Sequence, residues 1–90
     1  MAFTDVEIAQ VREAAVSAGQ CDDLYKLGLI YSTGQGGEVD LIQAHMWFNL
    51  AAMQGSGAAK ECRKELADLM SATEIASAQK AAREWLQTRH

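Results

Sequence analysis

The residues best suited to chemistry in this chain are a glycine-rich segment, one internal histidine and two cysteines. Glycine-rich loops can hold phosphate through backbone N–H groups, histidine can act as a general base or metal ligand, and a cysteine paired with histidine can act as a nucleophile. These residues are Gly34-Gln35-Gly36-Gly37, His45, Cys21 and Cys62. Each pattern has to be compared with what its chemistry requires.

None of the three patterns meets that requirement. The glycine-rich segment follows an expected helix and has no lysine, whereas phosphate-binding loops follow a strand and carry one, so it is interpreted as a hairpin turn. Four positions from His45 lie only Leu41 and Asn49, which are not credible metal ligands. The cysteines and histidine match no zinc spacing, and no third residue is identified that would orient a Cys–His pair. We therefore expect no catalytic residue, no metal and no cofactor.

Composition limits the class of protein. Ninety residues predict a single domain over residues 1–90, and the net charge is −4. Residues 1–55 carry seven acidic and two basic side chains, which argues against nucleic acid as a partner. The sequence has no apolar stretch of membrane-spanning length and no basic segment followed by an apolar run at its start. We expect no membrane contact, a cytoplasmic location and reduced cysteines.

Helix signals are found along the whole chain, and proline is absent. Three expected helix starts pair a capping side chain with Glu or Gln three residues later: Thr4 with Glu7, Asp40 with Gln43, and Ser71 with Glu74. Three glycines are expected to end helices: Gly19, Gly34 and Gly55. The predicted helices cover about residues 5–18, 22–33, 40–54, 58–70 and 72–88. Their short connections predict antiparallel neighbours.

The first, fourth and last of these helices each have one apolar stripe that we expect to be buried. The stripes are Ile8, Val11, Ala15 and Ala18; Ala59, Cys62, Leu66, Leu69 and Met70; and Ile75, Ala78, Ala82, Trp85 and Leu86. The third helix has two opposite apolar sides: Ala44, Trp47, Phe48 and Ala51, and Ile42, Met46, Leu50 and Met53. Such a helix has to be covered on both sides, either by its hairpin partner and the next helix or by a second chain.

A near repeat suggests how the helices are organised. Ala15, Ala18 and Gly19 recur 36 residues later as Ala51, Gln54 and Gly55. The chain also has a pattern of small and large residues that resembles a Sel-one-like repeat (SLR): Gly19, Leu27, Gly28, Tyr31, Gly34, Gly36, Asp40, Ala44, Trp47, Ala51 and Gly55. Gly28 and Ala44 would let two helices approach closely, with Tyr31 and Trp47 filling the wedge between them.

The resemblance implies an all-α fold of about five helices. Antiparallel helical hairpins would stack as a short right-handed α-solenoid, as in tetratricopeptide repeats. Residues 1–18 would be a half-repeat helix, residues 19–55 one full repeat, and residues 56–90 a decayed repeat with a closing helix. Gly37 replaces the hydrophobic residue that normally plugs the turn, and Val39 is the expected substitute.

The resemblance also implies a function, namely a non-enzymatic adaptor that binds a protein or peptide. The first helix of a hairpin lines the concave face, which would expose Asp22, Lys26, Leu29, Ile30 and Thr33. The alternative is a structural module that forms a homodimer through the stripe Ile42, Met46, Leu50 and Met53.

Overall fold

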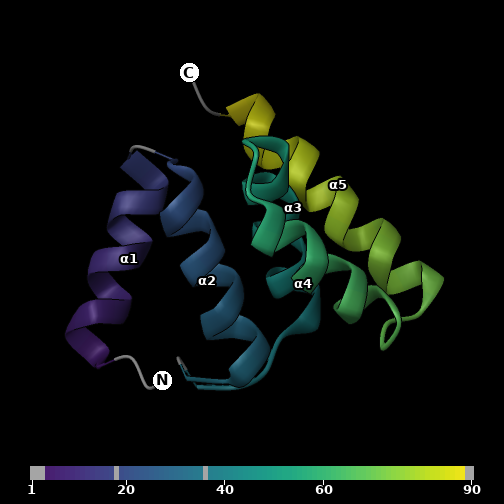
Figure 1. Ribbon diagram of the computed structural model, residues 1–90, viewed down its shortest axis with the longest axis horizontal. Helices are drawn as coiled ribbons and strands as arrows, with labels where there is room; N and C mark the ends of the chain where they lie inside the picture. The colour runs from purple at the N-terminus through teal and green to yellow at the C-terminus, as the bar shows by residue number, and fades with distance from the viewer. Residues whose placement is uncertain (1–3, 18, 36, 89–90) are drawn as a thin grey trace.

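The computed structural model describes residues 4–17, 19–35 and 37–88, which contain five α-helices and no strand (Figure 1). The helices are α1 (Asp5–Ser17), α2 (Cys21–Thr33), α3 (Leu41–Met53), α4 (Gly57–Ala67) and α5 (Ala72–Thr88). The expected all-helical hairpin fold is confirmed. The one boundary that differs by more than a residue is the end of α4, which stops at Ala67 rather than near residue 70. Gly36 and Ala18 lie outside the described residues.

Side-chain caps explain where four of the helices begin. In α1 the amide of Glu7 donates to Thr4 Oγ1 at 3.1 Å, and the amide of Thr4 donates to Glu7 Oε1 at 3.2 Å. Ser71 and Glu74 make the same pair of bonds before α5, at 3.1 and 2.9 Å. Asp40 accepts from the amide of Gln43 before α3. Ser56 caps α4 in the same way, although the sequence pattern had not singled it out.

Helix α3 lies at the centre of the molecule. It packs against α2, α4 and α5, while α1 packs against α2 at one end of the row (Figure 1). Five consecutive residues of α3, Ala44 to Phe48, are buried. A helix covered on only one side could not bury five residues in succession, since these point in all directions around its axis. The two apolar sides of α3 are therefore covered by other helices of the same chain.

The hairpin of α2 and α3 is closed at both ends. At the turn, Gly34 has φ +74°, and the amide of Asp40 donates to the carbonyl of Tyr31 at 3.0 Å. Val39, which was expected to fill the turn in place of the usual hydrophobic residue, lies beside Gly34. Its side chain is nevertheless exposed, so it fills the turn only in part. At the other end, Gln54 Nε2 donates to the carbonyl of Gly19.

The predicted core is largely observed, with two corrections. Ile8, Val11, Ala15, Ala59, Leu66, Met70, Ala78 and Ala82 are buried. Leu69 is 74% exposed, because α4 ends two residues earlier and Leu69 lies in the following turn. Leu86 is 42% exposed, because it lies in the last turn of α5, displaced from the packed stripe of Ala78, Ala82 and Trp85. Within the described residues, no helix has the length and apolar character needed to cross a membrane.

Candidate functional site

His45 is a core residue. Its side chain is 3% exposed on α3, and its Nδ1 has no hydrogen-bond partner among the residues that the structure describes. Burial lowers the pKa of His45, and the positive charge of Arg63 on α4 lowers it further. Arg63 itself donates to Asn49 Oδ1 at 2.6 Å. The burial of the imidazole supports the structural interpretation of His45.

The two cysteines lie apart from each other in different surroundings. Both are free and half-buried. Cys21 Sγ donates to the carbonyl of Ala51 at 3.6 Å, whereas Cys62 lies on α4 next to Tyr25 of α2. Burial raises the pKa of Tyr25, and the Cys62 side chain raises it further. Among the described residues, no three His, Cys, Asp or Glu side chains are grouped so that they could hold a metal ion.

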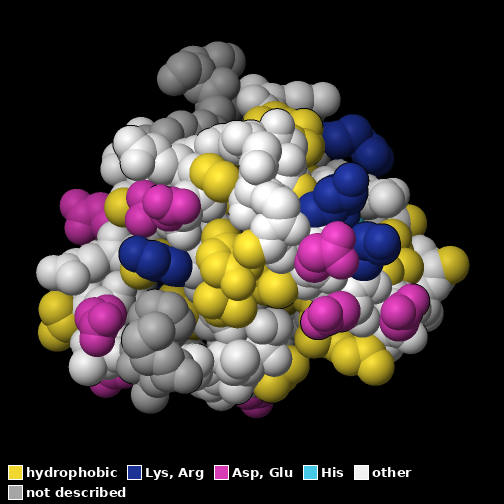
Figure 2. Space-filling model, viewed as in Figure 1, with side chains coloured by type: hydrophobic (Ala, Val, Ile, Leu, Met, Phe, Trp, Pro, Cys, Tyr) yellow, Lys and Arg dark blue, Asp and Glu magenta, His cyan; other side chains and the backbone are white. Residues whose placement is uncertain are grey.

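An apolar cleft lies between α2 and α4, with a volume of about 250 Å³. We call it the α2–α4 cleft. The residues that line it are Leu29 and Ser32 of α2, Phe48 of α3, Cys62, Glu65 and Leu66 of α4, and Leu69. Figure 2 shows hydrophobic side chains gathered at the middle of this face. Phe48 is buried, whereas Leu29 is only half-buried and Leu69 extends into solvent.

Acidic and basic side chains both lie around this apolar centre (Figure 2). Glu65 lines the cleft, and Glu61 lies one helical turn before it on α4. On α2, the exposed Asp22 lies two turns before Leu29, and the exposed Lys26 lies between them, one turn before Leu29. Lys26 also lines a second, more polar hollow with Glu7, Gln10, Val11, Ala14 and Asp23.

The structure places the residues expected on the concave face in different environments. Asp22, Lys26 and Thr33 are exposed and Leu29 is half-buried. The expected exposure of Ile30 is wrong, because its side chain is 0% exposed. Ile30 lies three residues after Leu27 and six after Leu24, so it shares their buried side of α2.

The stripe expected to serve self-association is not a free surface. Met46 and Leu50 are buried and Ile42 is half-buried, because neighbouring helices of the same chain cover this side of α3. Only Met53, at the end of the helix, is 62% exposed. Contact between two copies through this stripe would require the core to open.

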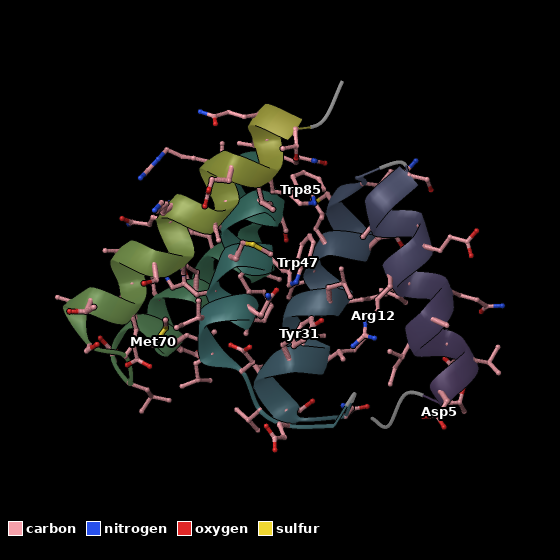
Figure 3. All side chains as sticks on the ribbon, turned by 180° about the vertical axis from the view of Figure 1, so that it is seen from behind. Asp5, Arg12, Tyr31, Trp47, Met70 and Trp85 are labelled. Atoms are coloured by element: carbon pink, nitrogen blue, oxygen red, sulfur yellow. The ribbon has the colours of Figure 1, made fainter. Side chains whose placement is uncertain are left out.

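The residues that define the repeat pattern mostly build the hairpin. Leu27, Gly28, Ala44, Trp47 and Ala51 are buried, and Gly19, Gly34 and Gly55 have positive φ. The wedge differs from the expectation: the ring of Trp47 meets Trp85 of α5 edge-on at 5.8 Å, while Tyr31 lies under the guanidinium of Arg12 (Figure 3). Trp47 therefore joins the hairpin to α5.

The α4 side of the cleft was not predicted as a site. Cys62, Leu66 and Leu69 were assigned to the core. The missing signal was their position: α4 is the first helix of the second hairpin, as α2 is of the first. Equivalent helices of successive hairpins lie side by side, so an apolar stripe on α4 faces the same groove as Leu29.

Comparison with known families agrees with this architecture. The family model of the Sel1 repeat matches residues 22–56, which include α2, the glycine turn and α3. Searches of the curated proteins and of the solved structures found no match. The matched segment overlaps the repeat expected over residues 19–55. The chain therefore carries a Sel1 repeat in its α2–α3 hairpin, and its five helices agree with the tetratricopeptide-like helical solenoid that this repeat implies.

Proposed function

We propose that this protein is a non-enzymatic adaptor that binds a protein or peptide segment in the α2–α4 cleft. Sel1 repeats generally mediate protein–protein interaction. The observation that carries the specific proposal is the cleft itself: partly exposed apolar side chains from two successive hairpins converge on one hollow. Exposed apolar surface with a polar border is typical of interaction sites.

The residues that line the cleft also favour binding. Leu29, Cys62 and Leu69 form the walls, and the buried ring of Phe48 lies at the base. Phe48 is held in place from below, because α3 is packed against three helices. A partner would therefore meet a preformed surface and would lose little free energy to ordering the protein.

The experiment is selection of displayed random peptides against the purified protein, followed by binding measurements with two obstructed forms. One is Leu29→Asp, which places a charge in the cleft wall. The other is the protein alkylated at Cys62 in a Cys21→Ala background, where the adduct occupies the cleft. The matched control is alkylation at Cys21 in a Cys62→Ala background. Cys21 lies against the carbonyl of Ala51 and is not one of the residues that line the cleft.

We expect selected peptides to bind the wild type and the Cys21 adduct and to lose at least tenfold in affinity for both obstructed forms. Circular dichroism should show unchanged helix content in all four proteins. If the selected peptides bind the obstructed, folded proteins as tightly as the wild type, the cleft is not the binding site.

A further inference from the structure

The geometry points to a specific class of partner for the α2–α4 cleft: a basic segment in which one large apolar side chain is flanked by lysine or arginine. This inference rests on the proposed function, because it names the ligand of the same cleft. It is carried by two separate properties of the site, the size of its apolar hollow and the sign of the charge on its rim.

The hollow fits one large apolar side chain. An apolar cavity of about 150 Å³ holds a benzene molecule. The cleft, at about 250 Å³, has room for a leucine, methionine or phenylalanine side chain of a partner. Among its lining residues only Ser32 and Glu65 have polar side chains, and the base is the ring of Phe48. A polar side chain inserted here would leave hydrogen-bonding groups unpaired, at a cost in affinity.

The rim carries negative charge. Glu65 lies at the cleft itself, Glu61 lies one turn before it on α4, and the exposed Asp68 lies at the end of that helix. The charges of neighbouring rim residues act together on a partner's cation, since the screening length in physiological salt is about 8 Å. A lysine or arginine next to the inserted side chain would be attracted to the α4 wall.

The basic residues of α4 do not cancel this charge at the α4 wall. Lys60 and Lys64 are each two positions from Cys62, so they project from the opposite side of α4. Arg63 is bonded to Asn49 of α3. Lys26 lines the hollow between α1 and α2, where Glu7 and Asp23 are its acidic neighbours.

A second copy of this chain fits the site less well. Two of its exposed apolar side chains, Val6 and Val39, have acidic residues on both sides in the sequence: Asp5 and Glu7, and Glu38 and Asp40. The acidic rim would repel both. Neither of these two segments of a second copy therefore has the basic flanks that the inference requires.

The test uses synthetic peptides of matched length, KKLLKK, EELLEE and KKSSKK, each labelled with fluorescein through a glycine spacer, and measures anisotropy with the full chain. KKLLKK should bind most tightly, and its affinity should fall as salt is raised from 50 to 500 mM. EELLEE and KKSSKK should each bind at least about tenfold more weakly, because one lacks the charge and the other the apolar anchor.

Charge-reversal variants assign the effect to the rim. The double variant Glu61→Lys and Glu65→Lys should weaken KKLLKK binding by about tenfold and strengthen EELLEE binding. The matched control is Glu84→Lys, an exposed acid on α5, which should leave both affinities unchanged. Equal binding of KKLLKK to the wild type and the double variant would overturn the inference.

Random-peptide selection separates this inference from the function on which it rests. Selected peptides that depend on Leu29 but show no enrichment of lysine and arginine would refute the basic partner while leaving the cleft as a binding site. Selected peptides that do not depend on Leu29 would refute both. A dimer in light scattering that Leu29→Asp dissociates would show that a second copy occupies the cleft, and would also overturn the inference.

Discussion

The ring of Phe48 on α3 occupies the space in which a Cβ atom on Gly28 of α2 would stand. Both residues are buried. The two helices of the repeat therefore approach at a point where any side chain on α2 would collide with the aromatic ring. Glycine is needed here because it has no side chain to meet the ring. In other respects glycine is unfavourable at this position, since inside a helix it lowers stability by about 1 kcal/mol relative to alanine.

Substitution Gly28→Ala should therefore destabilise the protein. The overpacking costs about 1–3 kcal/mol, which outweighs the gain of about 1 kcal/mol in helix propensity. Urea unfolding followed by circular dichroism at 222 nm measures the difference. Phe48→Leu introduced with Gly28→Ala should recover part of the loss, because it removes the ring that the new methyl group meets.

Gly57→Ala is the matched control for this substitution. Gly57 begins α4, and a Cβ atom there would have no neighbour within 4 Å. The control should equal the wild type in stability or exceed it by a few tenths of a kcal/mol. A Gly28→Ala protein as stable as the Gly57→Ala protein would contradict the close approach of α2 and α3.

The edge-on contact between Trp47 and Trp85 should be measurable as a coupling energy. Aromatic pairs in this geometry contribute about 0.5–1.5 kcal/mol beyond the area that they bury. A double-mutant cycle with Trp47→Phe and Trp85→Leu, analysed by urea unfolding, should give a coupling in this range. Leu86→Ala, next to Trp85 but 42% exposed, should change stability by no more than about 0.5 kcal/mol. Additive effects of the two tryptophan substitutions would show that the rings do not interact.

His45 should make the protein less stable as pH falls below 7. Burial and Arg63 lower the pKa of His45 in the folded state, whereas in the unfolded chain the pKa is near 6.5. Between these two pKa values the unfolded state binds more protons, so the free energy of unfolding decreases as pH falls through this window. The contribution of one proton cannot exceed about 1.4 kcal/mol per pH unit.

Urea unfolding at several pH values between 5 and 7.5 tests this dependence. His45→Gln should show a smaller decrease in stability over this range than the wild type, because the titrating group is gone. His90→Gln removes the other histidine of the sequence and should keep the wild-type slope. Identical slopes for the wild type and His45→Gln would place the pKa of His45 at its unfolded value.

The capping boxes of α1 and α5 should have different effects on stability although their hydrogen bonds are alike. Helix α5 packs against the central α3, whereas α1 packs mainly against α2 at the edge of the molecule. Ser71→Ala should lower global stability by about 1 kcal/mol. Thr4→Ala should mainly increase hydrogen exchange of the α1 amides, because edge helices open locally at lower free energy.

Native-state hydrogen exchange measures both effects in one experiment. The amides of α3 should be the most protected in the wild type, and those of α1 should exchange faster. An equal loss of protection in all five helices after Thr4→Ala would show that α1 unfolds only together with the rest of the protein.

Local features of the fold could be predicted from the sequence because each depends on nearby residues. The reciprocal pairs Thr4 with Glu7 and Ser71 with Glu74 form as predicted, since their partners are only three residues apart. The two apolar sides of α3 also predicted correctly that this helix is enclosed. Such a pattern specifies burial whichever helices provide it.

Contacts between distant helices could not be predicted in the same way. The sequence suggested that Trp47 would share a wedge with Tyr31, but its ring partner is Trp85, 38 positions away. The resemblance implied that Ile30 would be exposed, but its side chain is buried. The rotation of α2 about its axis decides this, and that rotation is set by packing against other helices, which no local sequence pattern records. The early end of α4 changed Leu69 from a core residue into part of the cleft wall.

The hydrogen bond from Gln54 to the carbonyl of Gly19 joins residues that are 35 positions apart in the sequence, which is about the length of one repeat. It ties the start of the hairpin to the point at which the next one begins, so the step from one unit to the next is fixed by a side chain inside the unit. Tandem copies of such a unit would follow one another at a constant rise and rotation. Lengthening the array would therefore extend its groove without disturbing the units already present.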